Sequence, residues 1–246
     1  MARFDGKTIV ITGGSSGIGL ATAQRIAEEG GRVLVTGTSA DKLAAVRSDA
    51  IHVVENDAAD PAAADALAAE AKRLFGKIDG AFLNAGIGAG APLGKITPDL
   101  YRRLMDLNVG GVLFGAQALA PLIRAGGSIL VTASAAKDKG MAGAAVYSAT
   151  KGAVRSMVKG LARELAPKGV RVNTISPGPI ETPFFERLGR PLEQLEALHN
   201  HIAATNPMGR MGTMAEAAAV AAFLLSDEAG FVTGSDYAVD GGEAQL

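Results

Sequence analysis

The sequence contains no cysteine. This absence excludes disulfides, thiolate nucleophiles and cysteine-ligated metal sites. Long hydrophobic runs are lacking too, since no window approaches the ~20 apolar residues of a membrane-spanning helix. The first seven residues also lack the apolar stretch of a signal peptide. We therefore expect a cytoplasmic protein with no membrane partner.

An excess of charge of one sign is absent as well. The chain has 24 lysines and arginines against 25 aspartates and glutamates, a net charge of -1, and no long run of like charges. This balance predicts no nucleic-acid partner. His199 and His201 lie two apart on a predicted helix and so point to different faces, which argues against a metal site. We expect His52 to be structural.

A regular alternation of segments is present instead. Hydrophobic residues make up 48% and charged residues 20% of the 246 residues, as is typical of a compact globular protein. Short runs rich in valine and isoleucine alternate with longer alanine-rich segments of helical character. This pattern predicts an α/β Rossmann fold, with a doubly wound parallel sheet of about seven strands and helices on both faces.

The predicted strands span residues 8–12, 32–36, 51–54, 78–83, 128–132, 170–175 and 237–239. The predicted helices span residues 17–29, 40–47, 62–75, 98–123, 145–166, 192–204 and 214–225. No linker divides this pattern, so we predict one domain over residues 1–246. Residues 178–212 interrupt the alternation with several prolines, and we expect this segment to be a substrate loop near a site.

A glycine-rich turn, TGGSSGIG at residues 12–19, follows the first predicted strand and opens the first predicted helix. Gly13 can form the turn, while Gly17 and Gly19 let a pyrophosphate and the strand approach the helix start. The helix N-terminus offers N–H groups and partial positive charge to phosphates. No Gly-Lys-Ser/Thr follows, which excludes a P-loop. The turn predicts dinucleotide binding, whereas the glycines of residues 86–94 indicate only a loop.

Tyr147 and Lys151 lie four residues apart on a predicted helix, which puts a phenol and an ammonium on one face. A neighbouring cation favours the charged form of an acid, so we expect Lys151 to lower the pKa of Tyr147 from about 10 toward neutrality. A general acid works best when its pKa lies near the working pH. The pair therefore indicates a proton donor, although chance also produces this spacing in many helices.

Several motifs together resemble the short-chain dehydrogenase/reductase family over essentially the whole chain. The matching elements are the TGxxxGxG turn, Asn84-Ala85-Gly86 after the fourth strand, Asn108 in a helix, Ser134, the YxxxK of residues 147–151, and Pro177-Gly178 after the sixth strand. The resemblance implies an oxidoreductase that transfers a hydride between a nicotinamide cofactor and a small-molecule ketone or secondary alcohol.

The resemblance also implies roles for individual residues. Tyr147 would act as general acid/base, Ser134 would hydrogen-bond the same substrate oxygen, and Lys151 would hold the nicotinamide ribose and depress the pKa of Tyr147. Asn108 would steady a water that links Lys151 to solvent. The predicted cofactor-binding residues are Gly13, Ser15, Ser16, Gly17, Ile18, Gly19, Gly37, Thr38, Ser39, Asp57, Ala58, Asn84, Ala85, Gly86, Tyr147, Lys151, Pro177, Gly178, Ile180 and Thr182.

Asp57 follows the third predicted strand and is a candidate acceptor for the adenine amino group. Its alternative interpretation is a residue of a surface loop or a helix cap.

The end of the second predicted strand distinguishes the two nicotinamide cofactors, because an acid there binds the adenine ribose and a base meets a 2′-phosphate. No acid stands at Gly37, and no arginine stands at Thr38 or Ser16. Hydroxyls of Ser16, Thr38 and Ser39 could donate hydrogen bonds to a phosphate, and Lys42 is a candidate nearby charge. We favour NADP(H), with NAD(H) as the alternative.

The candidate substrate-pocket residues flank Ser134 and Tyr147 or lie in the segment 178–212; they are Ala135, Met141, Ala144, Phe184, Phe185 and Leu188. Their apolar character predicts a hydrophobic ketone or alcohol and offers no clamp for a carboxylate or sugar. The two phenylalanines could equally form a lid hinge or ordinary packing. We expect Lys137 and Lys139, near Ser134, to lie on an exposed turn.

Two other functions remain open. One is a reductase of 3-oxoacyl thioesters on an acyl carrier protein, whose acidic surface could meet Lys137, Lys139, Arg187 and Arg190. The other is a nucleotide-sensing protein without chemistry, which has no need of the four catalytic residues. The resemblance further implies a homotetramer, packed through residues 145–165 and 220–225 and the C-terminal strand.

Overall fold

A computed structural model describes residues 2–183 and 192–246. Its seven strands form one parallel sheet in the order β3-β2-β1-β4-β5-β6-β7. The strands are β1 (Thr8–Thr12), β2 (Arg32–Gly37), β3 (Ile51–Glu55), β4 (Ile78–Leu83), β5 (Ile123–Thr132), β6 (Arg171–Pro177) and β7 (Asp236–Val239). The predicted α/β fold class is confirmed.

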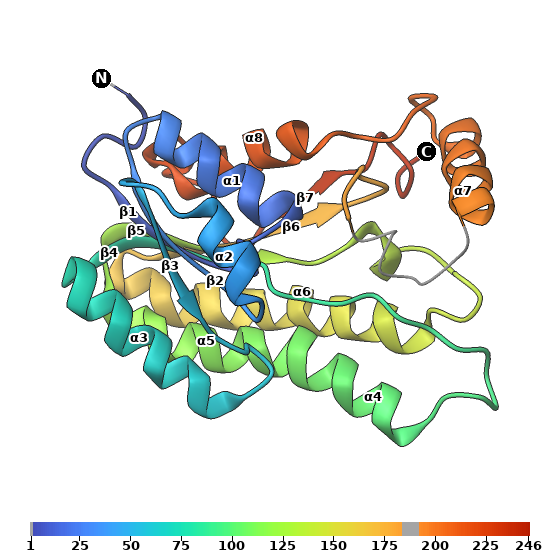
Figure 1. The fold of residues 1–246 in the computed structure, drawn as a ribbon, viewed down its shortest axis with the longest axis horizontal. Helices are drawn as coiled ribbons and strands as arrows, with labels where there is room; N and C mark the ends of the chain where they lie inside the picture. Colours follow the sequence, from blue (N-terminus) through green and yellow to red (C-terminus); the bar gives the residue numbers. More distant parts are fainter. Residues whose placement is uncertain (1, 184–191) are drawn as a thin grey trace.

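Helices cover both faces of this sheet (Figure 1). The α-helices are α1 (Gly17–Glu28), α2 (Ala40–Val46), α3 (Pro61–Phe75), α4 (Pro98–Met105), α5 (Gly111–Leu119), α6 (Ala145–Leu165), α7 (Leu192–Thr205) and α8 (Met214–Leu225). One hydrophobic core joins the sheet to α3, α5 and α6, and a second core joins the opposite face to α1, α2 and α8.

Strand β1 shows why the sequences of the buried strands are continuous apolar runs. All five of its residues are buried. Val10 packs in the core beneath α3, α5 and α6, whereas Ile9 and Ile11 pack in the core on the other face. Successive side chains of a strand point to opposite faces, so a sheet covered on both sides requires apolar residues at every position.

The helix predicted over residues 98–123 is wrong in its continuity and its end. It divides into α4, a π-helical turn over Asp106–Gly110, α5, and a 3₁₀ turn over Ala120–Leu122. Pro121 lies in that last turn and ends the helix, since proline has no amide hydrogen to donate. Strand β5 therefore begins at Ile123 rather than at Ser128.

The segment predicted to interrupt the alternation leaves the sheet after β6 and returns before α8. A parallel bridge joins Ile180 to Gly212 at the two ends of this excursion. Gly212 donates its N–H to the Pro179 carbonyl, and Glu181 donates to the Gly212 carbonyl, each at 2.9 Å. Helix α7 belongs to this excursion and lies apart from the helices that cover the sheet (Figure 1).

Candidate active site

A cleft of about 1420 Å³ opens on the described part of the chain. Residues at the carboxyl ends of β1, β2, β4, β5 and β6 line it. In open α/β sheets, ligands bind outside the carboxyl ends of the strands, where the strand order reverses. Here that reversal falls between β1 and β4, so the cleft lies where the fold places a ligand.

The glycine turn forms one wall of this cleft. Gly13 has φ +65°, and a Cβ there would lie 2.9 Å from Ala85 Cα. A Cβ at Gly19 would lie 2.5 Å from the Gly13 carbonyl oxygen, so Gly19 packs beneath the turn and does not line the cleft. Gly17 has φ +60° and faces Thr182, whose Cβ would be 3.9 Å from an added Cβ.

The first turn of α1 faces the cleft, because Ser15, Ser16, Gly17 and Ile18 all line it. A helix N-terminus attracts phosphate through its N–H groups and partial positive charge. The absence of side chains at the neighbouring glycines leaves room for the backbone to approach a ligand. The turn therefore fits the pyrophosphate of a dinucleotide.

Asn84 connects the glycine turn to the neighbouring strands through hydrogen bonds. Its Nδ2 donates to the carbonyl oxygens of Thr12 and Gly13, each at 3.2 Å. Its Oδ1 accepts from Thr132 Oγ1 at 3.0 Å, and Thr12 Oγ1 accepts from the N–H groups of Asn84 and Ala85. The ends of β1, β4 and β5 are thus held together. Asn84, Ala85 and Gly86 also line the cleft.

The end of the cleft beside β2 and β3 contains the residues that were predicted to bind the adenosine part of a cofactor. Gly37, Thr38, Ser39 and Lys42 line it, together with Asp57 and Ala58. A Cβ at Gly37 would lie 2.7 Å from Ser15 Oγ, so a larger residue there would require the Ser15 side chain to move.

Two of these polar groups already make local contacts. Ser39 caps α2 by accepting from Lys42 N at 3.4 Å. One oxygen of Asp57 accepts from Ala59 N at 3.0 Å. The loop interpretation of Asp57 therefore holds beside the binding interpretation, since its other oxygen has no such contact among the described residues.

Tyr147 and Ser134 lie together at the opposite end of the cleft, both among its lining residues. Ser134 is 9% exposed, and its Oγ accepts from Ala136 N at 3.1 Å. Burial raises the pKa of Tyr147 above its ordinary value of 10.0, and a hydrogen bond with Ser134 opposes this rise. The expected lowering of the Tyr147 pKa by Lys151 is therefore wrong for this structure.

Lys151 is buried below Tyr147, at 4% exposure, while its end still reaches the cleft. Its Nζ donates to the Thr132 carbonyl at 2.9 Å and lies 5.9 Å from the centroid of the Tyr147 ring. Burial lowers the pKa of Lys151 to about 8. The Lys151 ammonium is itself desolvated and donates to the Thr132 carbonyl rather than to Tyr147. It therefore does little to stabilise the tyrosinate form of Tyr147.

Asn108 does not line the cleft but lies buried behind it, in the π-helical turn. Its Oδ1 accepts from Ile87 N at 2.9 Å, and its Nδ2 donates to the Ile87 carbonyl at 3.0 Å and to Thr150 Oγ1 at 3.2 Å. A Cβ at Gly86 would lie 3.1 Å from Asn108 Oδ1 and 3.4 Å from Lys151 Nζ. Asn108 thus ties the loop after β4 to helix α6 beside Lys151.

Four residues predicted to bind the cofactor line the cleft after β6; they are Pro177, Gly178, Ile180 and Thr182. Gly178 packs so closely on the C-terminal tail that a Cβ would lie 2.5 Å from Asp240 Cβ.

The end of the cleft beside Ser134 and Tyr147 contains three of the residues predicted for the substrate pocket, Ala135, Met141 and Ala144. Phe184, Phe185 and Leu188 lie outside the described residues. The loop of residues 86–92, predicted only as a loop, also lines this end, as do Ile202 and Thr205 of α7. The position of that loop directly after the carboxyl end of β4 was the signal that could have placed it here.

Lys139 and Glu243 also line the cleft, where their side chains form an ion pair at 2.6 Å. The partners are 104 residues apart in sequence, so no local pattern predicted this pair.

The expectation that Lys137 lies on an exposed turn is wrong. Its side chain is 6% exposed, and its Nζ pairs with Asp138 and, at 2.8 Å, with Asp236. The sequence around Lys137 does not reveal this burial, because the acidic partner Asp236 lies on a distant strand.

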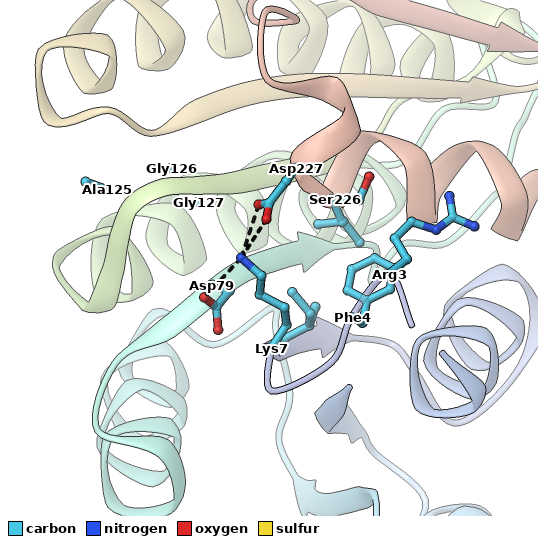
Figure 2. Close-up of a pocket in the computed structure, with 11 residues that line it drawn as sticks. Arg3, Phe4, Lys7, Asp79, Ala125, Gly126, Gly127, Ser226 and Asp227 are labelled. Carbon is cyan, nitrogen blue, oxygen red and sulfur yellow. Dashed lines mark hydrogen bonds and ion pairs between the residues drawn. The ribbon is translucent and has the colours of Figure 1, made fainter. Parts of the chain in front are cut away.

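A second cavity, of about 260 Å³, lies at the other end of the sheet (Figure 2). Lys7 in this cavity pairs with Asp227 at 2.9 Å and with Asp79 at 4.0 Å. Arg3 pairs with Glu29 at 2.6 Å. Each cation here has an acidic partner, and the cavity offers no group poised for chemistry.

Among the described residues, no group of three histidine or acidic side chains could hold a metal ion. No helix in the same part of the chain is long and apolar enough to cross a membrane.

The chain is similar to known proteins along nearly its whole length. Residues 13–243 match a family model described as Enoyl-(Acyl carrier protein) reductase. The chain is 36% identical to the 2-dehydro-3-deoxy-L-rhamnonate dehydrogenase (NAD(+)) of Sphingomonas sp. (strain SKA58), over 98% of this chain and 96% of that protein. It is also 36% identical to the NADP-dependent (R)-specific alcohol dehydrogenase of Lentilactobacillus kefiri, over 98% and 97% of the two chains.

A solved short-chain dehydrogenase/reductase from Brucella melitensis has the same fold, with a TM-score of 0.91 and 35% identity over 98% of both chains. The fold and these relatives together define an α/β oxidoreductase. The chain belongs to the short-chain dehydrogenase/reductase family, whose members use nicotinamide cofactors. The predicted family and enzyme class are confirmed.

Proposed function

We propose that this protein interconverts a ketone and a secondary alcohol with NADP(H), with Tyr147 as general acid/base. The observation that supports this function best is the convergence of Tyr147, Ser134 and Lys151 at one end of a cleft whose other end has the glycine turn. The relative from Lentilactobacillus kefiri is named for such an activity.

The chemistry needs a proton at the substrate oxygen as that oxygen gains negative charge, and the bound nicotinamide supplies or accepts the hydride. Tyr147 donates the proton when the ketone is reduced and accepts it when the alcohol is oxidised. The Ser134 hydroxyl hydrogen-bonds the same oxygen and fixes its distance from Tyr147. Lys151 binds the ribose hydroxyls of the cofactor through its ammonium, and Asn108 holds the loop after β4 beside it.

The raised pKa of Tyr147 is compatible with this role in the reducing direction, because it keeps the phenol protonated at neutral pH. A positively charged oxidised cofactor beside Tyr147 would favour tyrosinate and assist the reverse direction.

NADP(H) is the proposed cofactor because the end of β2 presents hydroxyls and a lysine rather than an acid. Thr38 is exposed and Lys42 lies on the first turn of α2, both facing the cleft. An acidic side chain at Gly37 would collide with Ser15. The two curated relatives are named for different cofactors, so they favour neither.

The thioester alternative gains no support from charge at the cleft entrance. Lys137 is buried in ion pairs, and Lys139 is neutralised by Glu243. Arg187 and Arg190 lie outside the described residues.

We also propose a homotetramer. Two exposed apolar side chains near the C-terminus, Phe231 and Leu246, would be covered in such an assembly. Sedimentation of the protein as a monomer would refute this assembly.

A panel of ketones and secondary alcohols, assayed with each nicotinamide cofactor and including one 3-oxoacyl thioester, tests the proposed function. We expect turnover of simple ketones with NADPH. Turnover of the thioester alone would favour the carrier-protein reductase, and binding of a cofactor without turnover of any substrate would contradict the proposal.

A further inference from the structure

The carboxylate of Asp236, at the start of β7, connects several elements behind the cleft. Its Oδ1 accepts hydrogen bonds from Ser176 Oγ at 2.6 Å and Thr174 Oγ1 at 2.7 Å, both on β6. Its Oδ2 lies 2.8 Å from Lys137 Nζ and 3.8 Å from Arg155 Nε. The Asp236 side chain is 18% exposed, so these contacts lie largely out of water.

Lys137 brings the turn of Ser134 to this carboxylate. It is the last residue of the 3₁₀ turn Ala135–Lys137, which begins directly after Ser134. The Lys137 N–H donates to the Ser134 carbonyl at 3.2 Å, and the Ala136 N–H donates to Ser134 Oγ at 3.1 Å. A displacement of Lys137 would therefore move both the backbone and the hydroxyl of Ser134.

Arg155 brings helix α6 to the same carboxylate. It lies one helical turn after Lys151, on the helix that also contains Tyr147. Its Nη1 donates to the Gly234 carbonyl at 2.9 Å, two residues before Asp236. The elements that present the Ser134 and Tyr147 hydroxyls are thus both tied to the start of β7.

Stability alone does not account for a buried ion pair at this place. Desolvation of two charges offsets most of their attraction, and an apolar pair of similar volume is often as stable. An ion pair with several hydrogen bonds does, however, fix the relative positions of the elements that it joins. At a proton-transfer site, a displacement of about 1 Å can reduce the rate by about 100-fold.

We propose that Lys137 and Asp236 are positioning residues, whose ion pair fixes the Ser134 hydroxyl relative to Tyr147. The inference rests on the proposed function of Ser134 and Tyr147, and it assigns neither Lys137 nor Asp236 a contact with substrate.

Both groups keep their charges over a wide pH range. Burial acts to lower the pKa of Lys137, but hydrogen bonds to Asp138 and Asp236 outweigh it and raise that pKa above its ordinary value. Burial acts to raise the pKa of Asp236, but hydrogen bonds from Lys137, Ser176 and Thr174 bring it below its ordinary value. The geometry is therefore maintained without titration of the pair.

The test is a double-mutant cycle with Lys137→Met in the wild-type and Ser134→Ala backgrounds. In the wild type we expect kcat to fall about tenfold or more, with the cofactor Kd within about twofold. In the Ser134→Ala background we expect little further loss, because the group that Lys137 positions is already gone. Cofactor titration counts the folded sites, so kcat refers to folded enzyme only.

Two further variants separate positioning from folding. Asp236→Asn keeps the shape of the side chain and an acceptor for Ser176 and Thr174 but removes the charge. We expect the same loss of kcat as in Lys137→Met, and again little further loss in the Ser134→Ala background. Lys7→Met is the matched control, since it breaks an ion pair with Asp227 at the far end of the sheet (Figure 2). We expect its kcat to equal that of the wild type.

Wild-type kcat in Lys137→Met, or an equal fold-loss in both backgrounds, would overturn the positioning role while leaving the proposed function intact. If instead Ser134→Ala itself retains wild-type turnover, the proposed function of Ser134 is wrong and the inference falls with it.

Discussion

Lys151 places an ammonium group in the interior with no acidic side chain within ion-pair distance among the described residues. Within the same part of the chain, the acceptor of its hydrogen bond is neutral, the Thr132 carbonyl at 2.9 Å. Burial lowers the pKa of Lys151 to about 8, so the charge is held at an energetic disadvantage in the absence of a ligand. Such a disadvantage is common at functional sites, where a ligand or reaction uses the destabilised group.

This lowered pKa predicts a pH dependence of stability. The unfolded lysine has its ordinary pKa of 10.5, so between about 8 and 10.5 the unfolded state binds more protons than the folded state. The free energy of unfolding contributed by this group must then rise with pH across that window. We expect the stability of the wild type relative to Lys151→Met to increase from pH 8 toward pH 10.5.

Urea unfolding of the two proteins without cofactor, at pH values below, within and above this window, measures the effect. The comparison with Lys151→Met removes the contribution of all other titrating groups. A stability difference that stays constant across the window would contradict a buried ammonium with a lowered pKa.

The spacing of Tyr147 and Lys151 correctly placed both side chains at one site, because helical periodicity alone decides which face they share. It could not give the sign of the Tyr147 pKa shift. That sign depends on how deeply the phenol is buried and on the acceptor toward which Lys151 Nζ points, and both are set by the packing of α6 against the sheet rather than by helical spacing.

At the scale of elements, the π-helical turn between α4 and α5 positions a buried side chain. Asn108 lies in this turn and hydrogen-bonds both backbone groups of Ile87, so a helix and the loop after β4 behave as one unit. π-Turns inside helices occur frequently at functional sites. Here the turn aims Asn108 at the loop and at Thr150 of α6.

We predict that Asn108→Ala destabilises the protein, by about 1–3 kcal/mol for each buried backbone group of Ile87 that water cannot reach. We also expect a lower kcat, because the loop beside Gly86 and Lys151 loses its anchor. Chemical denaturation and steady-state kinetics measure the two effects.

Ser128→Ala serves as the control for this prediction. It removes a buried hydrogen bond from Ser128 Oγ to the Leu224 carbonyl, at 2.9 Å and far from the cleft. We expect a loss of about 1 kcal/mol with unchanged kcat. Unchanged stability and turnover in Asn108→Ala would contradict the role of the π-turn.

The sequence predicted this helix region only in part. Pro121 is visible in the sequence and should have ended the helix before Ile123. The π-turn was not predictable in the same way, because Gly110 and Gly111 at its end are also tolerated inside a regular helix and do not by themselves indicate an inserted residue. The strand boundary was wrong as well, since β5 takes Ile123 from the predicted helix and residues 124–127 that had been assigned to neither element.

At the scale of the whole molecule, the cleft along the carboxyl end of one sheet has the glycine turn toward one end and Tyr147, Ser134 and Lys151 toward the other. A cofactor bound as proposed would link these two ends, so its binding should stabilise the folded chain. A ligand at about 100 times its Kd contributes about 2.7 kcal/mol.

We therefore expect NADPH to raise the Tm more than NADH at the same concentration. Lys42→Ala should reduce the shift with NADPH and leave the shift with NADH nearly unchanged, because only the 2′-phosphate needs the cation. Arg47→Ala is the control, since Arg47 lies at the other end of α2 and outside the cleft. A larger shift with NADH in the wild type would overturn the proposed cofactor.

The order of elements and the positions of Gly13 and Tyr147 were predictable because each rests on local pattern, whereas Ser134 was implied by the family resemblance. Contacts that depend on the assembled sheet were not. Lys137 meets Asp236 across nearly 100 residues, and Lys139 meets Glu243 across 104. Both lysines looked like solvent-exposed charges until the chain brought an acid to each of them.

The most direct test of the central claim is the turnover of Tyr147→Phe on a ketone that the wild type reduces. The substitution removes one hydroxyl and keeps the ring. We predict a fall in kcat of about 10²–10⁴-fold with a cofactor Kd within about twofold of the wild type. Turnover within a few-fold of the wild type would contradict Tyr147 as the proton donor.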